Sequence, residues 1–364
     1  MTMLISRRSA LGSAAATGAL ALAGTPARAQ ADPLKAAWIY VGPVGDFGWS
    51  YRHDIGRRAV QETLGDKVVT SYVESVPEGP DAERVLRQLA TTGNRLIFAT
   101  SFGFMNSVVR VARQFPDVKF EHATGTERAD NISTYAARFY EGRAVIGTMA
   151  GTVTKSGIVG YVAPFPIPEV VRGVNSFILA ARKQRPDIRV KLVWANAWYD
   201  PGKEADAAKA LIDQGADVIS QHTDSPAPLQ VAQERGVVGF GQASDMSAYA
   251  PEAQLTSIVD NWDQYYTDRA QSVIDGTWTS TDTWLGLKSG MVEMAPYGPK
   301  VTPEVAAEAD KVRDAIVAGT LHPFAGPITD QKGEVRVAEG AVASDEELLK
   351  MDWWVPGVEG QLGG

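Results

Sequence analysis

The stretch LATTGNRLIFATSF at residues 89–102 returns as LIDQGADVISQHTD at residues 211–224, and FEHAT at residues 120–124 returns as FGQAS at residues 240–244. Each copy of the longer stretch combines a helix end, a glycine, a hydrophobic strand and a polar strand tip. The copies lie about 120 residues apart, which is far too long a period for a solenoid repeat. We therefore predict two similar α/β lobes whose strand tips face one another.

The first 29 residues resemble an export signal. The twin-arginine pair Arg7 and Arg8 precedes a small apolar stretch at residues 10–24, and an AxA site follows at residues 27–29. The apolar stretch is shorter than a membrane-spanning helix requires. We predict a signal peptide at residues 1–29 and a mature soluble protein in the periplasm, exported by the twin-arginine route or by the general secretory route.

The composition excludes several classes of function. The chain has 35 Lys and Arg against 43 Asp and Glu, and loss of the three leader arginines changes the net charge from −8 to −11. Nucleic acid is not an expected partner, because phosphate binding requires clustered cations. The sequence has no cysteine, which excludes disulfides, a thiol nucleophile, zinc–thiolate sites and a lipid-bearing cysteine. We predict no cofactor and no metal.

Strand and helix patterns alternate along the chain, as expected for parallel sheets with right-handed crossovers. The predicted strands are at residues 36–41, 67–73, 95–100, 119–123 and 132–135, and then at 157–162, 190–195, 217–221, 237–241 and 255–259. We assign residues 30–138 and 262–320 to the first lobe and residues 139–261 to the second, with several strands forming the hinge. Residues 321–364 are predicted to pack back on the lobes through Trp353 and Trp354.

Ligands of parallel α/β sheets bind at the loops after the carboxyl ends of the strands. The predicted strand tips carry aromatic, carboxylate, amide and hydroxyl groups. They are Asp46, Phe47, Trp49, Ser101, Phe102, His122, Thr124, Asn196, Trp198, Thr223, Asp224, Gln242, Ser244 and Asp245. Aromatic faces suit a flat uncharged ring, and acceptors suit a ring edge rich in N–H donors. A purine has both properties, and a sugar suits the same mixture.

Some of these residues also have a structural interpretation. Phe47 and Trp198 could be plugs beneath loops instead of ligand platforms, although the repeat brings their strand tips together. Asp200 is predicted to cap the helix that starts at the following proline. Asp245 has no obvious helix behind it, which makes it the preferred polar anchor for a ligand.

An enzyme is the main alternative class. The stretch GPVGDFG at residues 42–48 lies where a dinucleotide-binding fold has its glycine-rich turn. Its spacing is GxxGxxG instead of GxGxxG, and Asp46 would repel a pyrophosphate. His122 and His222 are expected to be hydrogen-bonded strand-tip residues and not metal ligands, because no second His or carboxylate lies at helix spacing from either. No GxSxG elbow occurs. We predict a binding protein, with an exported NAD(P)-dependent oxidoreductase as the less favoured alternative.

Six short motifs, in this order, resemble the basic membrane protein (BMP) family. They are GDFGW (45–49), TSFG (100–103), RFYEG (138–142), DPGKE (200–204), QASD (242–245) and GLKSG (286–290). The resemblance runs from about residue 35 to about residue 329. It implies a type I substrate-binding protein of an ABC transporter, related to purine-nucleoside receptors. The implied fold is an α/β clamshell of two lobes.

The resemblance also implies site residues and partners. In the family a purine is sandwiched between one aromatic ring from each lobe, and the matching positions are Phe47 and Trp198. The family carboxylate that accepts hydrogen bonds from the ligand matches Asp245. Nucleoside-binding relatives have a lysine where this chain has Asp260, which favours a free base, adenine ahead of hypoxanthine, guanine and xanthine. The expected partner is an ABC permease, and we expect a monomer.

Overall fold

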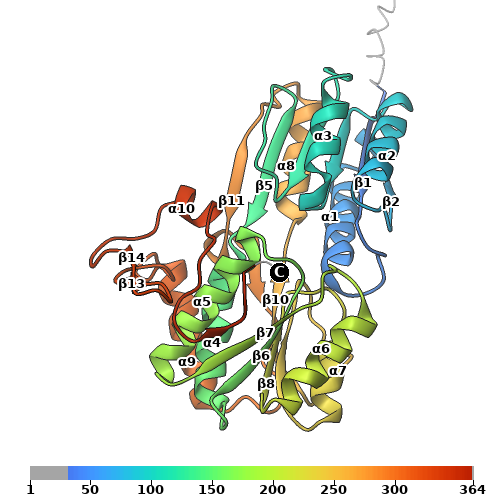
Figure 1. Ribbon diagram of the computed structural model, residues 1–364. Helices are drawn as coiled ribbons and strands as arrows, with labels where there is room; N and C mark the ends of the chain where they lie inside the picture. The colour runs from blue at the N-terminus through green and yellow to red at the C-terminus, as the bar shows by residue number, and fades with distance from the viewer. Residues whose placement is uncertain (1–31, 363–364) are drawn as a thin grey trace, which may run out of the picture. The chain divides into compact units, whose positions relative to one another are not determined.

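Two mainly parallel sheets form the framework of the computed structural model, which describes residues 32–362 (Figure 1). The predicted signal peptide at residues 1–29 lies outside the described residues. The first sheet has the order β11-β5-β4-β3-β1-β2 and the second has the order β12-β10-β9-β8-β6-β7-β15. The first five strands of each lobe therefore occupy corresponding places, which confirms the two similar lobes predicted from the repeat.

The first sheet is entirely parallel. Its strands are β1 (Leu34–Ile39), β2 (Val68–Val73), β3 (Leu96–Ala99), β4 (Lys119–Ala123), β5 (Ile132–Ala137) and β11 (Asp282–Leu285). Its helices are α1 (Gly48–Leu64), α2 (Pro80–Thr91), α3 (Met105–Ala112) and α8 (Asp263–Ile274). Because side chains alternate across a strand, Trp38 belongs to a different core cluster from its neighbour Ile39.

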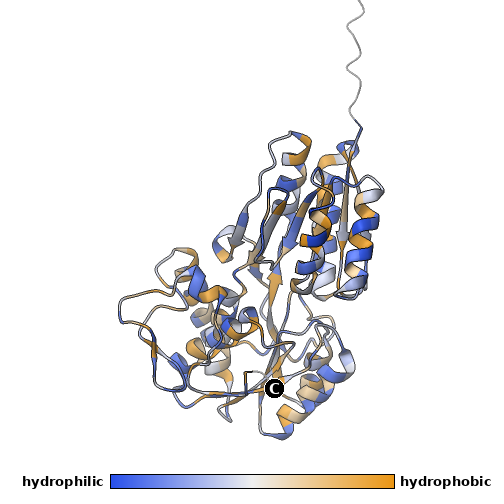
Figure 2. Cartoon of the chain, turned by 45° about the horizontal axis from the view of Figure 1, so that its top comes forward, coloured by the Kyte–Doolittle hydropathy of each residue, from blue (hydrophilic) through white to orange (hydrophobic). Residues whose placement is uncertain are grey.

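The second sheet is parallel except for one edge strand, β12, which runs antiparallel to β10. Its strands are β6 (Ile158–Ala163), β7 (Arg189–Trp194), β8 (Val218–Gln221), β9 (Val238–Gly241), β10 (Gln254–Asp260), β12 (Val292–Met294) and β15 (Val358–Glu359). Its helices are α4 (Phe139–Val153), α5 (Pro168–Gln184), α6 (Pro201–Asp213), α7 (Ala227–Glu234) and α9 (Pro303–Val317). Hydrophobic residues recur along the strands of both sheets (Figure 2).

Three chain crossings join the lobes, after β5, after β10 and after β11. The third crossing differs from the predicted division, which placed residues 262–320 in the first lobe. In the structure, β12 pairs with β10 and α9 packs on α4, so the chain returns to the second lobe after Leu285. The strand β12 is only three residues long, and its pattern alone does not show which sheet it joins.

The C-terminal segment from residue 321 packs on the second lobe and braces the hinge. It contains β13 (Ile328–Thr329), β14 (Val335–Val337) and α10 (Asp345–Leu349), and then β15, which pairs with β7. Trp354 is 4% exposed and its ring stacks on Trp194 with centroids 6.4 Å apart. Arg138, in the first crossing, makes two hydrogen bonds of 2.7 Å to the Asp345 carboxylate. Among the described helices, none combines the length and hydrophobicity needed to cross a membrane.

Candidate functional site

The N-terminus of helix α1 contacts the strand tips of the opposite lobe. The Gly48 N–H donates to the Ser244 hydroxyl at 2.7 Å, and the Trp49 N–H donates to the Asp224 carboxylate. The first N–H groups of a helix have no partner within it, and Phe47 at the N-cap offers no side-chain acceptor. The second lobe therefore supplies the cap, and the structure has the lobes closed on one another.

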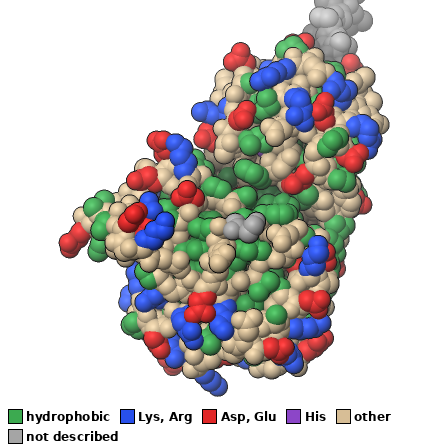
Figure 3. All heavy atoms as spheres, viewed as in Figure 1, with side chains coloured by type: hydrophobic (Ala, Val, Ile, Leu, Met, Phe, Trp, Pro, Cys, Tyr) green, Lys and Arg blue, Asp and Glu red, His purple; other side chains and the backbone are tan. Residues whose placement is uncertain are grey.

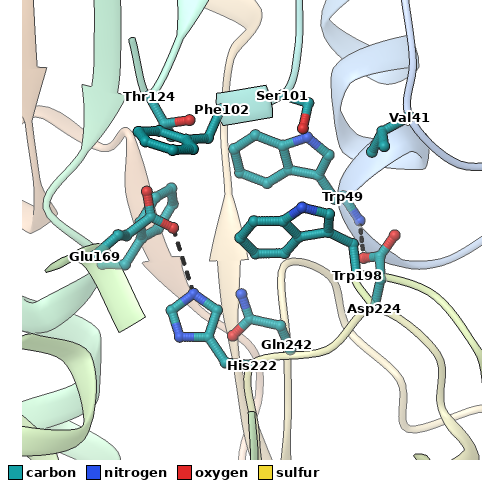
Figure 4. A pocket seen from close by; sticks show the side chains of 11 residues that line it. Val41, Trp49, Ser101, Phe102, Thr124, Glu169, Trp198, His222, Asp224 and Gln242 are labelled. Atoms are coloured by element: carbon teal, nitrogen blue, oxygen red, sulfur yellow. Dashed lines mark hydrogen bonds and ion pairs between the residues drawn. The ribbon is translucent and has the colours of Figure 1, made fainter. Parts of the chain in front are cut away.

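A cavity lies between the lobes beside this contact (Figure 4). The first lobe and the first crossing supply Val41, Trp49, Ser101, Phe102, Thr124 and Phe139, and the second lobe supplies Glu169, Trp198, His222, Asp224 and Gln242. On the face drawn in Figure 3, hydrophobic side chains gather where the lobes meet.

Aromatic rings come from both sides of this cavity. The Trp49 indole is fixed by a 2.6 Å hydrogen bond from its N–H to the Thr100 carbonyl and by edge contacts with Phe139 and Trp262. Phe102 begins a short 3-10 turn (Phe102–Phe104) directly after the β3 tip. Trp198 lies in the loop between β7 and α6, where its ring meets Phe165 edge-on at 5.4 Å. Figure 4 shows the Trp49 and Trp198 rings one above the other in that view.

The polar groups of the cavity come mainly from the second lobe. The side-chain oxygen of Gln242 accepts a hydrogen bond from Arg143. His222 lies 3.4 Å from Glu169, and burial lowers the pKa of His222 to about 4, so this imidazole is neutral and donates to the carboxylate. Burial alone would raise the pKa of Glu169, but the His222 hydrogen bond and nearby arginines lower it. Glu169 is therefore a charged acceptor.

Asp224 has an unusual environment for a carboxylate. It is 9% exposed, and burial raises its pKa to about 7, against the opposing effect of the Trp49 N–H. The charge of Glu204 acts in the same direction as burial. Asp224 therefore keeps its proton to a much higher pH than an ordinary carboxyl group, while it caps a helix of the other lobe.

Half of the predicted ligand residues line the cavity. These are Trp49, Ser101, Phe102, Trp198, Asp224 and Gln242, and the tip residue Thr124 joins them. Ser101 donates to Glu78 at 2.5 Å, which leaves its oxygen lone pairs as acceptors. The repeat predicts that these loops converge, and in the structure the corresponding strand tips of the two facing sheets do meet at this cavity.

Phe47 and Asp46 lie outside the cavity lining, although they were predicted to bind the ligand. The Phe47 ring is 6.5 Å from Tyr199 and contacts Tyr249 edge-on at 5.1 Å. Asp46 is exposed and accepts a hydrogen bond from the Tyr249 hydroxyl. Both residues precede the first turn of α1, so that turn brings Trp49 to the cavity instead.

Asp245, the preferred polar anchor, is exposed and also lies outside the lining. Its carboxylate accepts hydrogen bonds from the Ser247 N–H at 2.9 Å and from Gln254 at 2.7 Å, so it organises its own loop. Asn196 is exposed with a φ of 51°, on the outside of its loop. The Asp200 side chain caps α6 by accepting from the Lys203 N–H at 3.1 Å, as predicted.

The remaining two predicted residues are buried behind the cavity. His122 is 2.8 Å from the Ser101 carbonyl, and burial lowers its pKa to about 4. It therefore positions a loop that does reach the cavity. Asp260 ends β10 at the second crossing, and within residues 32–362 its two carboxylate oxygens have no hydrogen-bond partner. Burial raises the pKa of Asp260 well above the usual range.

Five lining residues were not predicted as ligand residues: Val41, Thr124, Phe139, Glu169 and His222. Glu169 follows Pro168 at the start of α5, directly after the β6 tip, and this position could have indicated it. His222 was predicted to be a hydrogen-bonded strand-tip residue and not a metal ligand, but it was not predicted to contact the ligand. Its place in the repeat, beside Thr223 and Asp224, was the available signal.

Two facing α/β lobes, three crossings and a cavity between strand tips define the type I periplasmic-binding-protein fold. The family description "ABC transporter substrate-binding protein PnrA-like" matches residues 34–322, and the chain belongs to this family, Bmp. This confirms the resemblance found in the sequence.

Several relatives and solved structures are similar to this chain. A purine-binding protein of Brucella abortus is 53% identical over 347 residues, which cover 95% of this chain and 99% of that protein. A Haloferax volcanii protein, named provisionally as an ABC transporter glucose-binding protein, is 38% identical over 92% of this chain and 82% of its own. The crystal structure of an ABC transporter solute-binding protein from Aeropyrum pernix K1 has a TM-score of 0.68, with 20% identity over 80% of this chain and 93% of that one. At that identity the structural match supports the fold alone.

Proposed function

We propose that this protein is the periplasmic solute-binding protein of an ABC import system and that it binds a purine base. The lobes close on the ring, and a membrane permease then receives the ligand from the closed form. Binding and release are its whole task, and we expect it to work as a monomer. This proposal includes export from the cytoplasm through the N-terminal signal.

The observation that carries the proposal is a cavity between the lobes that has aromatic rings from both lobes and polar groups at one side. Trp198 of the second lobe and the first-lobe rings of Trp49 and Phe102 line the same space. We propose that the purine lies between these rings. This arrangement replaces the pair of Phe47 and Trp198 expected from the sequence. The purine-binding relative, at 53% identity, supports the same ligand class.

We favour a free base over a nucleoside, with adenine ahead of hypoxanthine, guanine and xanthine. The argument rests on position 260, where nucleoside-binding relatives carry a lysine that can reach the ribose. Asp260 supplies no cation there, and its buried carboxylate does not line the cavity. The choice of adenine is part of the proposal and is tested together with the ligand class.

Titration calorimetry with the four bases and their nucleosides tests the proposal. Trp198→Ala is expected to weaken binding of the preferred base at least tenfold, because stacking on one aromatic ring is worth about 1–3 kcal/mol. Phe102→Ala should weaken it in the same direction, and Phe47→Ala should weaken it less than either. Trp353→Ala is the matched control, since it removes the same ring from the C-terminal segment. Equal affinities for wild type and Trp198→Ala would contradict the stacking.

A sugar is the second candidate ligand, because the Haloferax relative carries a glucose-binding name and aromatic rings with carboxylates also suit sugars. Thermal-shift measurements with glucose, other monosaccharides, riboflavin and nicotinamide cofactors alongside the purines separate these classes. Stabilisation by a sugar and not by a purine would replace the proposed ligand.

A further inference from the structure

We propose that Arg143 is a positioning residue that fixes the side-chain amide of Gln242, so that Gln242 can only donate hydrogen bonds to the ligand. The inference rests on the proposed function and deepens it, because it assigns a chemical requirement to the ligand. The atom that meets Gln242 must be a hydrogen-bond acceptor.

Arg143 lies behind the cavity wall and not on it. It is on α4, one turn after Phe139, and its side chain is 0% exposed. Its guanidinium donates to the Gln221 carbonyl at 2.8 Å and to the side-chain oxygen of Gln242. Within the described residues, none of its hydrogen bonds reaches a carboxylate. This buried cation is held by neutral oxygens, one of which belongs to a cavity residue.

The contact determines how the Gln242 amide is turned. An amide has one acceptor oxygen and one donor NH₂ group, and the two orientations are usually hard to distinguish from shape alone. A guanidinium has only donors, so it can pair with the oxygen and not with the NH₂ group. The NH₂ group of Gln242 is therefore the part left for the cavity, and Figure 4 shows its nitrogen directed towards the aromatic rings.

The rest of the polar wall is complementary to this donor. Glu169 lines the cavity as a charged acceptor, since neutral His222 donates to it and leaves its remaining lone pairs free. Gln242 therefore presents a fixed donor and Glu169 a fixed acceptor, and in this frame neither group can change its role. When the exocyclic amino group of a purine is replaced by an oxo group, a hydrogen-bond donor is replaced by an acceptor. Such a frame therefore discriminates between purines that differ only by that exchange.

Arg143 could instead serve only to support the fold, through the Gln221 carbonyl and through its position 5.6 Å above the Tyr161 ring. A purely supporting role would change the affinity for all purines together. A positioning role changes the preference between them, and it does so only when Gln242 is present. The ratio of two dissociation constants distinguishes the two roles.

The experiment measures dissociation constants of the full-length protein for adenine and hypoxanthine by calorimetry. The wild type is expected to prefer one base at least tenfold, and Arg143→Met should lower this preference at least fivefold because the amide is free to rotate. Arg143→Lys, which restores a donor, should keep most of the preference. In a Gln242→Met background, Arg143→Met should leave the preference unchanged. Melting temperatures and circular dichroism check that each variant is folded.

Gln242→Glu keeps the inference testable if Arg143→Met does not fold. The new carboxylate pairs with Arg143 and has no donor for the ligand, so binding of the preferred base should weaken at least tenfold in a protein as stable as wild type. Unchanged binding by Gln242→Glu would overturn the inference. It is also overturned by a wild-type preference near one, by a preference that survives Arg143→Met, or by an Arg143→Met effect that persists without Gln242. A wild type that binds no purine refutes the proposed function itself, and this failure is visible before any variant is made.

Discussion

Asp224 links two properties that are usually separate, a place in the ligand cavity and a cap on a helix of the opposite lobe. Its carboxylate accepts from the Trp49 N–H, and burial raises its pKa from an ordinary value of 3.8 to about 7. A carboxyl group with a raised pKa stabilises the folded state relative to the unfolded chain below the ordinary pKa. That contribution is lost as the pH rises through about 7.

Asp224→Asn tests this assignment, because the amide is uncharged at every pH and keeps an oxygen for the Trp49 N–H. The melting temperature of the variant relative to wild type should therefore increase between pH 4 and pH 8. At pH 8 we expect the variant to be more stable by at least roughly 2 °C, since 1 kcal/mol changes the melting temperature of a large domain by about 2–4 °C. Scanning calorimetry across this range measures the difference, and a flat profile would contradict the assignment.

At this scale the sequence predicted residue types better than residue roles. The strand tips brought Asp224 and Gln242 to the cavity, because the repeat fixes where corresponding strands end. The sequence did not show which of Asp224 and Asp245 lines the cavity. Both follow strands of the second lobe, and only the path of the loop decides which one is buried. Phe47 and Trp49 are two residues apart, and the start of α1 between them determines which one lines the cavity.

Helix α1 has a glycine at its first position for a steric reason. Gly48 has a φ of 79°, and a Cβ atom there would lie 2.4 Å from a carboxylate oxygen of Asp224 and 2.7 Å from its carbonyl oxygen. Gly45, three residues earlier, also has a positive φ, of 51°, but a Cβ atom there meets nothing within 4 Å. Substitution of either glycine would strain the backbone, but only substitution of Gly48 would also disturb the contact between the lobes.

Gly48→Ala should weaken ligand binding at least tenfold, because the added methyl group prevents the helix from reaching Asp224. Gly45→Ala, the matched control, places alanine at a positive φ without a clash and should change affinity less than threefold. The common cost of alanine in the left-handed region, about 1–2 kcal/mol, affects the stability of both variants. Calorimetric titration with the preferred base gives the comparison, and equal losses in the two variants would contradict this role for Gly48.

Elements with strong local patterns were predicted well from the sequence. The strand at residues 119–123 has the predicted bounds, and the glycines of the repeated stretch, Gly93 and Gly215, both have the positive φ of a helix stop. The short strands β11 and β12 were not predicted. They are four and three residues long, and their place depends on pairing with distant strands instead of on their own sequence.

The whole molecule is organised around three crossings, and the first of them is bonded both to the third and to the C-terminal segment. Arg138 in the first crossing donates its backbone N–H to Leu285 at 2.7 Å, and its guanidinium pairs with Asp345 of the C-terminal segment. These bonds therefore hold the hinge together at its first crossing, next to Phe139 of the cavity lining. The sequence indicated a hinge of several strands but could not place its third crossing, because this depends on the antiparallel pairing of β12.

Because the second lobe caps α1, the hydrogen exchange of two backbone amides depends on whether the lobes are open or closed. In a molecule with separated lobes, the amides of Gly48 and Trp49 have only solvent as a partner, since the first turn of a helix cannot satisfy them. Deuterium uptake at these two positions should therefore slow when the preferred base is added, while uptake in the middle of α1 stays constant. The exchange rate of these two amides would then report the fraction of protein in the closed, ligand-bound form. Ligand occupancy could be measured in this way without attaching a label to the protein.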